Sequence, residues 1–122
     1  MLRVLIDDVR SFRDGRPCLV ARSSAAGVEL LLSLTDTTID ELWLDFDLVG
    51  DDSIWPVVEL LVAHRFQIAA VIVHASRSGP AMRVVHALRP AGYEVKRSYD
   101  LTIWTHKLSD PPGKLDVEGG SR

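Results

Sequence analysis

The sequence predicts an α/β fold, a three-layer sandwich in which helices cover a mainly parallel sheet of five strands. Short apolar runs alternate with segments whose apolar residues follow helical spacing. One run, Ile68–Val73, is continuously apolar and rich in β-branched residues, which is typical of a central strand buried on both faces. The length of 122 residues, of which 47% are hydrophobic, suits one domain with one core.

The first half of the chain is expected to hold three strands and one helix. Leu2–Ile6 is expected to form a buried strand, and Cys18–Ala21 a short second strand that follows a polar loop. A helix is expected between the second and third strands. Ser23 or Ser24 can cap its start, and Gly27 inside it weakens it slightly. Glu41–Asp45 is expected to form the third strand. The apolar residues that define the helix are Val28, Leu31, Leu32 and Leu34.

The second half continues the alternation and then departs from it. Residues 53–65 predict a helix that Ser53 caps, and residues 79–89 predict another that begins at Gly79-Pro80. Tyr93–Arg97 and Leu101–Lys107 both alternate like strands, so we expect a hairpin or one bent edge strand.

Composition bounds the organisation and the class of protein. The domain is expected to span residues 1–108, and residues 109–122 are expected to form a flexible tail because they hold two prolines, three glycines and five charges. The net charge of −3 argues against an extended nucleic-acid surface. No apolar stretch reaches the roughly 20 residues of a membrane span. The single cysteine, Cys18, excludes an internal disulfide and favours the cytoplasm. A homodimer is compatible with the sequence.

Acidic residues follow two of the predicted strands at the point where each strand ends. Asp7 and Asp8 follow the first strand, and Asp45 and Asp47 lie at the end of the third. Because the carboxyl ends of parallel strands meet at one edge, these carboxylates are expected to converge. Their mutual repulsion calls for a shared proton or a divalent cation, and Mg²⁺ suits a set of oxygen ligands. Taken singly, each motif also fits solvated turn residues.

Other polar residues are placed to complete such a site. His74 follows the most apolar strand and suits a general acid or base, a donor to phosphate, or a core histidine bonded to a carbonyl. Ser76 precedes a helix start, where it can bind an anion or simply cap the helix. Arg10, with Arg13 and Arg16 in the same loop, can grip a phosphate or remain solvated.

The layout resembles the receiver domain of bacterial response regulators. In that family an acidic pair follows the first strand, here Asp7-Asp8, and a phosphate-accepting aspartate ends the third, here Asp45. The segments Leu-Asp-Phe-Asp-Leu-Val-Gly at 44–50 and Val-His-Ala-Ser at 73–76 are similar to the motifs of a divergent branch, the cyclic-phosphate-processing receiver-like family. The resemblance covers residues 2–97.

This chain departs from both families at named positions. Phe46 stands where the divergent branch has a histidine between two aspartates, and His74 stands where ordinary receivers have serine or threonine. Lys96 is the counterpart of the lysine that receivers carry after the fifth strand, and Arg97 follows it. The last receiver helix has no counterpart in the sequence.

The resemblance implies a metal-assisted phosphoesterase that acts on a cyclic or terminal phosphate of a nucleotide or an RNA end. It implies that Asp7, Asp8 and Asp45 hold Mg²⁺. Asp47 or His74 would move the proton, and the charge developing on the phosphate would be neutralised by Lys96 or Arg97. The alternatives are a non-enzymatic receiver-like module that is phosphorylated at Asp45 or signals by binding, and a degenerate binding domain whose lost chemistry is marked by Phe46.

Overall fold

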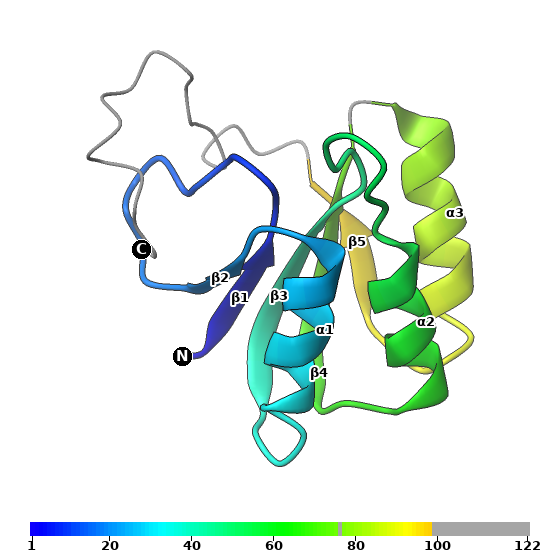
Figure 1. The fold of residues 1–122 in the computed structure, drawn as a ribbon. Helices are drawn as coiled ribbons and strands as arrows, with labels where there is room; N and C mark the ends of the chain where they lie inside the picture. The colour runs from blue at the N-terminus through cyan, green and yellow to red at the C-terminus, as the bar shows by residue number, and fades with distance from the viewer. Residues whose placement is uncertain (76, 99–122) are drawn as a thin grey trace.

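The computed structural model describes residues 1–75 and 77–98. All strand pairs in it are parallel and form one five-stranded sheet in the order β2-β1-β3-β4-β5 (Figure 1). The elements in chain order are β1 (Arg3–Ile6), β2 (Leu19–Ala21), α1 (Ser24–Leu32), β3 (Ile39–Asp45), α2 (Trp55–Ala63), β4 (Ile68–His74), α3 (Ser78–Leu88) and β5 (Val95–Arg97). The second strand-like run, Leu101–Lys107, and the predicted tail lie outside the described residues.

Serines mark the starts of the first two helices. Ser23 is the cap residue of α1, and its Oγ accepts a hydrogen bond from the Ala26 N–H at 3.1 Å, as predicted. At α2 the cap position is Ile54, one residue later than expected, and the Ser53 Oγ accepts from the Trp55 N–H at 3.0 Å. Each hydroxyl satisfies a backbone donor that the helix cannot satisfy itself.

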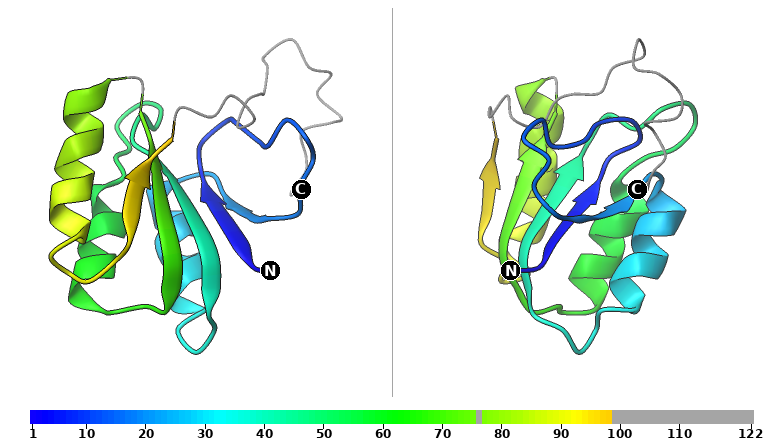
Figure 2. Two further views of the ribbon diagram at one scale, coloured as in Figure 1. Left: turned by 180° about the vertical axis from the view of Figure 1, so that it is seen from behind. Right: turned by 90° about the vertical axis from the view of Figure 1, so that its left-hand side faces the viewer.

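The two faces of the sheet differ in what covers them. Alternate strand residues enter two separate apolar clusters: Leu42 and Val71 join a large cluster with residues of all three helices, whereas Trp43 and Ile72 join a small cluster without helical residues. In Figure 1 helices α1 and α2 stand in front of the strands, and the view from behind in Figure 2 shows the strands in front. We call the face that carries Trp43 and Ile72, which no helix of the described residues covers, the open face.

The receiver-like parallel sheet is confirmed, but the described residues supply only two of the three predicted layers. The connection from β1 to β2 is a loop and not a helix, as its polar sequence predicted. No helix therefore covers the open face within residues 1–75 and 77–98. The expectation of a third layer came from the general rule that parallel sheets are covered on both sides.

The β1–β2 loop partly covers the open face. Phe12, which is 6% exposed, packs edge-on against Trp43 with ring centroids 5.0 Å apart. The guanidinium groups of Arg16 and Arg3 lie 4.7 and 5.7 Å from the centroid of its ring. These cation–π contacts hold the loop against the sheet and fix the segment that follows Asp7 and Asp8.

Gly27 has a packing role that outweighs its low helix propensity. A Cβ at this position would lie 2.9 Å from Ile6 Cδ1 and 3.2 Å from Val57 Cγ2. The missing side chain therefore allows α1 to approach β1 and α2 closely. None of the helices in the described part of the chain combines the length and the apolarity needed to cross a membrane.

Candidate metal and phosphate site

Three carboxylates converge at the carboxyl edge of the sheet. Asp7 and Asp8 follow β1, Asp45 ends β3, and the pairing of Ile6 with Leu44 places these strand ends side by side. One oxygen atom from each of the three side chains lies within 4.8 Å of the other two. Three hard oxygen donors at such separations form a ligand set that suits Mg²⁺.

The Asp7 side chain is fully buried and only half satisfied. Its Oδ1 accepts hydrogen bonds from the backbone N–H groups of Arg10 at 2.7 Å and Val9 at 3.0 Å. Its Oδ2 is buried and has no hydrogen-bond partner among the described residues. A buried carboxylate oxygen without a partner is costly, so this atom fits a site for a positively charged ligand.

Burial and neighbouring charge keep protons on this cluster. Asp45 is 3% exposed, and its Oδ1 accepts a hydrogen bond from the Asp47 N–H at 2.9 Å. Burial, followed by the charge of Asp7, raises the pKa of Asp45 to about 8. The same two causes raise the pKa of Asp8 above its ordinary value. A divalent cation bound among Asp7, Asp8 and Asp45 would offset the repulsion between these carboxylates. It would also compete with protons for their oxygen atoms.

His74 lies at the end of β4, beside Asp45 in the sheet register, and contacts Arg10. The Arg10 Nη1 and His74 Nε2 atoms are 2.7 Å apart. Because a guanidinium only donates hydrogen bonds, Nε2 must be the acceptor, and the imidazole is therefore neutral with its proton on Nδ1. Burial, followed by the Arg10 charge, lowers the pKa of His74, in agreement with this assignment.

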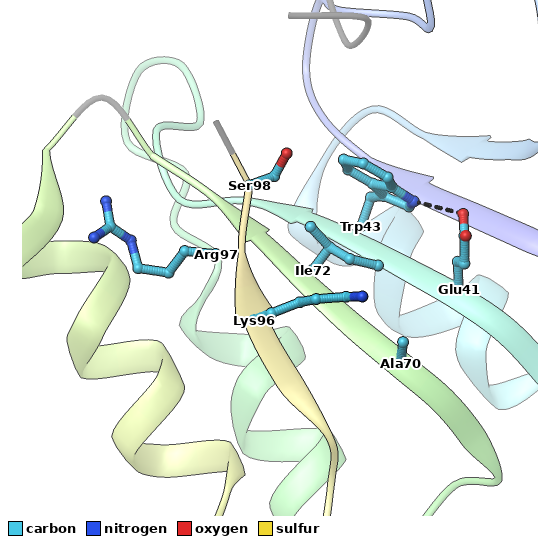
Figure 3. A pocket seen from close by; sticks show the side chains of 7 residues that line it. All are labelled: Glu41, Trp43, Ala70, Ile72, Lys96, Arg97 and Ser98. Atoms are coloured by element: carbon cyan, nitrogen blue, oxygen red, sulfur yellow. Dashed lines mark hydrogen bonds between the residues drawn. The ribbon is translucent and has the colours of Figure 1, made fainter. Parts of the chain in front are cut away.

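The other predicted site residues are spread more widely. Asp47 is exposed at the rim, where its N–H contacts Asp45. Lys96 pairs with Ile72, two residues before the end of β4, and makes no ion pair within the described chain. The Arg97 side chain points toward α3 (Figure 3). Ser76 lies outside the described residues.

Phe46 directs its ring toward the helices. It makes an edge-on contact with Trp55, with centroids 6.4 Å apart, and the Arg83 guanidinium lies 5.7 Å from its centroid. It also packs against the large apolar cluster on the helix-covered face. A side chain at position 46 therefore lies over α2 and α3, whereas the carboxylates lie at the strand ends.

The arginines of the β1–β2 loop play different parts. Arg16 pairs with Asp14 at 2.6 Å in addition to its contact with Phe12, and Arg13 is exposed. Arg22, which the sequence did not single out, donates to the carbonyl oxygens of Arg10 at 2.5 Å and Asp7 at 3.2 Å. It thus ties the acidic end of β1 to the start of α1.

Asp52 is a second supporting residue that spacing alone could not reveal. Its carboxylate accepts hydrogen bonds from the Ser24 N–H at 2.8 Å and the Ser24 hydroxyl at 2.5 Å. These bonds lower the pKa of Asp52. They fasten the loop after β3 to the first turn of α1, and the partners lie 28 residues apart in the chain.

A family model described as "Cyclic-phosphate processing Receiver domain" matches residues 2–90. The chain belongs to this family. The match covers all three converging carboxylates, Arg10 and His74. It confirms the predicted resemblance to the cyclic-phosphate-processing receiver-like family. No curated protein and no solved structure matches the chain significantly.

Proposed function

We propose that this receiver domain is a Mg²⁺-assisted phosphoesterase that acts on a cyclic or terminal phosphate of a nucleotide or an RNA end. The observation that carries the proposal is the convergence of Asp7, Asp8 and Asp45, with the buried Asp7 Oδ2 unpartnered within the described residues. The family description, which names cyclic-phosphate processing, supports the class of substrate.

The residues at this edge fit a magnesium ion. Asp7, Asp8 and Asp45 would hold it, since all three offer carboxylate oxygens within 4.8 Å of one another. Bound Mg²⁺ supplies positive charge that polarises phosphoryl oxygens. With the cation present, the raised pKa of Asp45 would fall and its carboxylate would be ionised.

Arg10 and His74 are placed to act on the phosphate and on a proton. The guanidinium of Arg10 lies beside His74 at the strand ends, and its planar set of N–H groups matches the geometry of phosphate oxygens. His74 is neutral, and its Nε2 lone pair faces Arg10 in the free domain. It can serve as the base that takes a proton from the attacking water once a bound phosphate has drawn the Arg10 guanidinium away from Nε2. Asp47 is the alternative proton carrier at the rim. We propose Arg10 for the role that the resemblance implies for Lys96 or Arg97, because Arg10 contacts His74 at the strand ends, whereas Lys96 pairs with Ile72 two residues earlier.

Turnover of 2′,3′-cyclic nucleotides with and without Mg²⁺ tests the proposal. We expect Asp45→Asn and His74→Ala each to lower kcat/KM by about 10²-fold or more. Thermal unfolding of Asp45→Asn should lose the stabilisation that Mg²⁺ gives the wild type, whereas His74→Ala should keep it.

The matched control is Asp36→Asn, which neutralises an exposed aspartate before β3, at the opposite edge of the sheet. It should leave turnover and the Mg²⁺ response unchanged. A wild type that hydrolyses no cyclic phosphate contradicts the phosphoesterase. If such a protein formed a beryllofluoride adduct at Asp45, it would instead be a phosphoacceptor module.

A further inference from the structure

A hollow on the open face lies beside the carboxylate site. It has a volume of about 360 Å³ and is lined by residues of the three strands β3, β4 and β5 (Figure 3). Its apolar floor comes from Trp43, Ala70 and Ile72, of which Trp43 and Ile72 are 6% and 5% exposed. The floor is therefore well packed before any ligand arrives, and the volume falls in the range of small-molecule pockets.

The hollow lies on the same strands as the candidate phosphate site, a short distance before their carboxyl ends. Trp43 and Ile72 stand two residues before Asp45 and His74 on the same strands, which corresponds to about 7 Å along the sheet. Ser98, another lining residue, donates its N–H to the Val73 carbonyl at 3.0 Å, next to His74. A ligand whose phosphate lies at the strand ends can therefore extend a ring system into the hollow.

Polar groups of both kinds surround the apolar floor. The Lys96 side chain reaches across the hollow from β5 and makes no ion pair in the described part of the chain. On the opposite side, Glu41 accepts hydrogen bonds from Arg3 at 2.7 Å and Trp43 Nε1 at 3.0 Å. Although burial opposes it, these bonds lower the pKa of Glu41, so it remains an ionised acceptor.

We propose that this hollow binds the base of a nucleoside phosphate, with Lys96 donating to a ring nitrogen or carbonyl and Glu41 accepting from an amino group. A flat heterocycle that carries donors and acceptors at its edge matches an apolar floor between a cation and a carboxylate. The inference rests on the proposed function, because the phosphate at Asp7, Asp8 and Asp45 anchors the ligand. It makes nucleotides, and not simple cyclic phosphates, the preferred substrates.

Binding of two ligands to the full chain tests the inference directly. The probes are adenosine 2′,3′-cyclic phosphate and the base-free 1-O-methylribose 2′,3′-cyclic phosphate, each followed by the NMR signals of the tryptophan indole N–H groups. The Trp43 signal is assigned with Trp43→Phe. We expect only the nucleotide to shift it, and we expect the nucleotide to bind about tenfold or more tightly than the base-free compound.

Two variants change the hollow without touching the carboxylates. Lys96→Gln removes an exposed cation, and Ala70→Leu fills the floor. Each should weaken nucleotide binding by about tenfold and leave the base-free compound unaffected. The matched control is Arg65→Gln, which removes an exposed cation before β4, at the far edge of the sheet, and should change neither affinity.

Turnover measured in parallel separates the two proposals. If the wild type hydrolyses both cyclic phosphates with equal kcat/KM and binds them equally, the base pocket is overturned and the phosphoesterase stands. If the nucleotide shifts the Trp43 signal and Lys96→Gln abolishes the preference, but nothing is hydrolysed, the pocket stands and the phosphoesterase is overturned.

Discussion

The two faces of this sheet are built from the same strands but in different ways. On the helix-covered face, residues such as Leu44 are enclosed by a large cluster that includes all three helices. On the open face, Leu5, Trp43 and Ile72 form a small cluster with Phe12, and charged residues such as Lys96 stand around it. Asp45 and His74 continue the rows of Trp43 and Ile72. One face thus stabilises the domain, and the other leads to the candidate chemistry.

The largest expected effect compares one leucine from each face. Leu44 and Leu5 are both 1% exposed and lie on neighbouring strands. We expect Leu44→Ala to lower the free energy of unfolding by about 4 kcal/mol, since the helices cannot collapse into the cavity. Leu5→Ala should cost about 2–3 kcal/mol, because the Phe12 loop can move into the space. Urea unfolding measures both, and equal losses would show that the open face is as rigid as the helix-covered one.

The next effect concerns protons on the acidic edge without metal. The pKa of Asp45 is about 8 in the folded chain against 3.8 for a free group. Between pH 3.8 and about pH 8, Asp45 holds a proton in the folded state that it has lost in the unfolded state. The free energy of unfolding therefore falls as the pH rises through this range. The slope reaches at most about 1.4 kcal/mol per pH unit.

Unfolding in EDTA between about pH 6.5 and 8 isolates this contribution. His74 acts in the opposite direction, because its lowered pKa removes stability as pH falls below its ordinary 6.5. Asp45→Asn should flatten the pH dependence in this window. A variant with the same slope as the wild type would assign the bound proton to another group.

A smaller effect tests the close packing beneath the helix-covered face. In Gly27→Ala the new methyl group would clash with Ile6 and Val57, which destabilises the fold by about 1–3 kcal/mol. Alanine has the higher helix propensity, which stabilises the helix by about 1 kcal/mol. We expect a net loss of about 1 kcal/mol in chemical denaturation. Gly79→Ala is the control, since nothing lies within 4 Å of its added Cβ, and it should be neutral or stabilising.

The smallest effect is expected from removing the predicted tail. A chain that ends at Leu108 should keep the melting temperature of the full chain, because residues 109–122 hold little apolar surface. Calorimetry of the two chains makes the comparison. A fall of several degrees would mean that the tail packs against the domain, and the open face would then be the first surface to examine.

The sheet and its connections were predictable because each apolar run is short and bounded by clear breakers. The carboxylates could be placed at the strand ends for the same reason, since Asp7 and Asp45 directly follow or close such runs. The Arg10–His74 contact could not, because its partners are 64 residues apart and meet only through the sheet order. The role of Lys96 at the phosphate came from the family resemblance, and the register of the short β5, which places Lys96 beside Ile72, could not be read from the sequence.

The Arg10–His74 contact makes the basicity of the imidazole depend on what Arg10 holds. In the free domain the guanidinium charge helps to lower the pKa of His74. An anion that pairs with Arg10 offsets this charge, so the affinity of His74 for a proton rises when the anion arrives. By thermodynamic linkage, protonation of His74 must strengthen anion binding by the same factor. Anion binding at Arg10 in the β1–β2 loop and protonation of His74 at the end of β4 therefore strengthen each other.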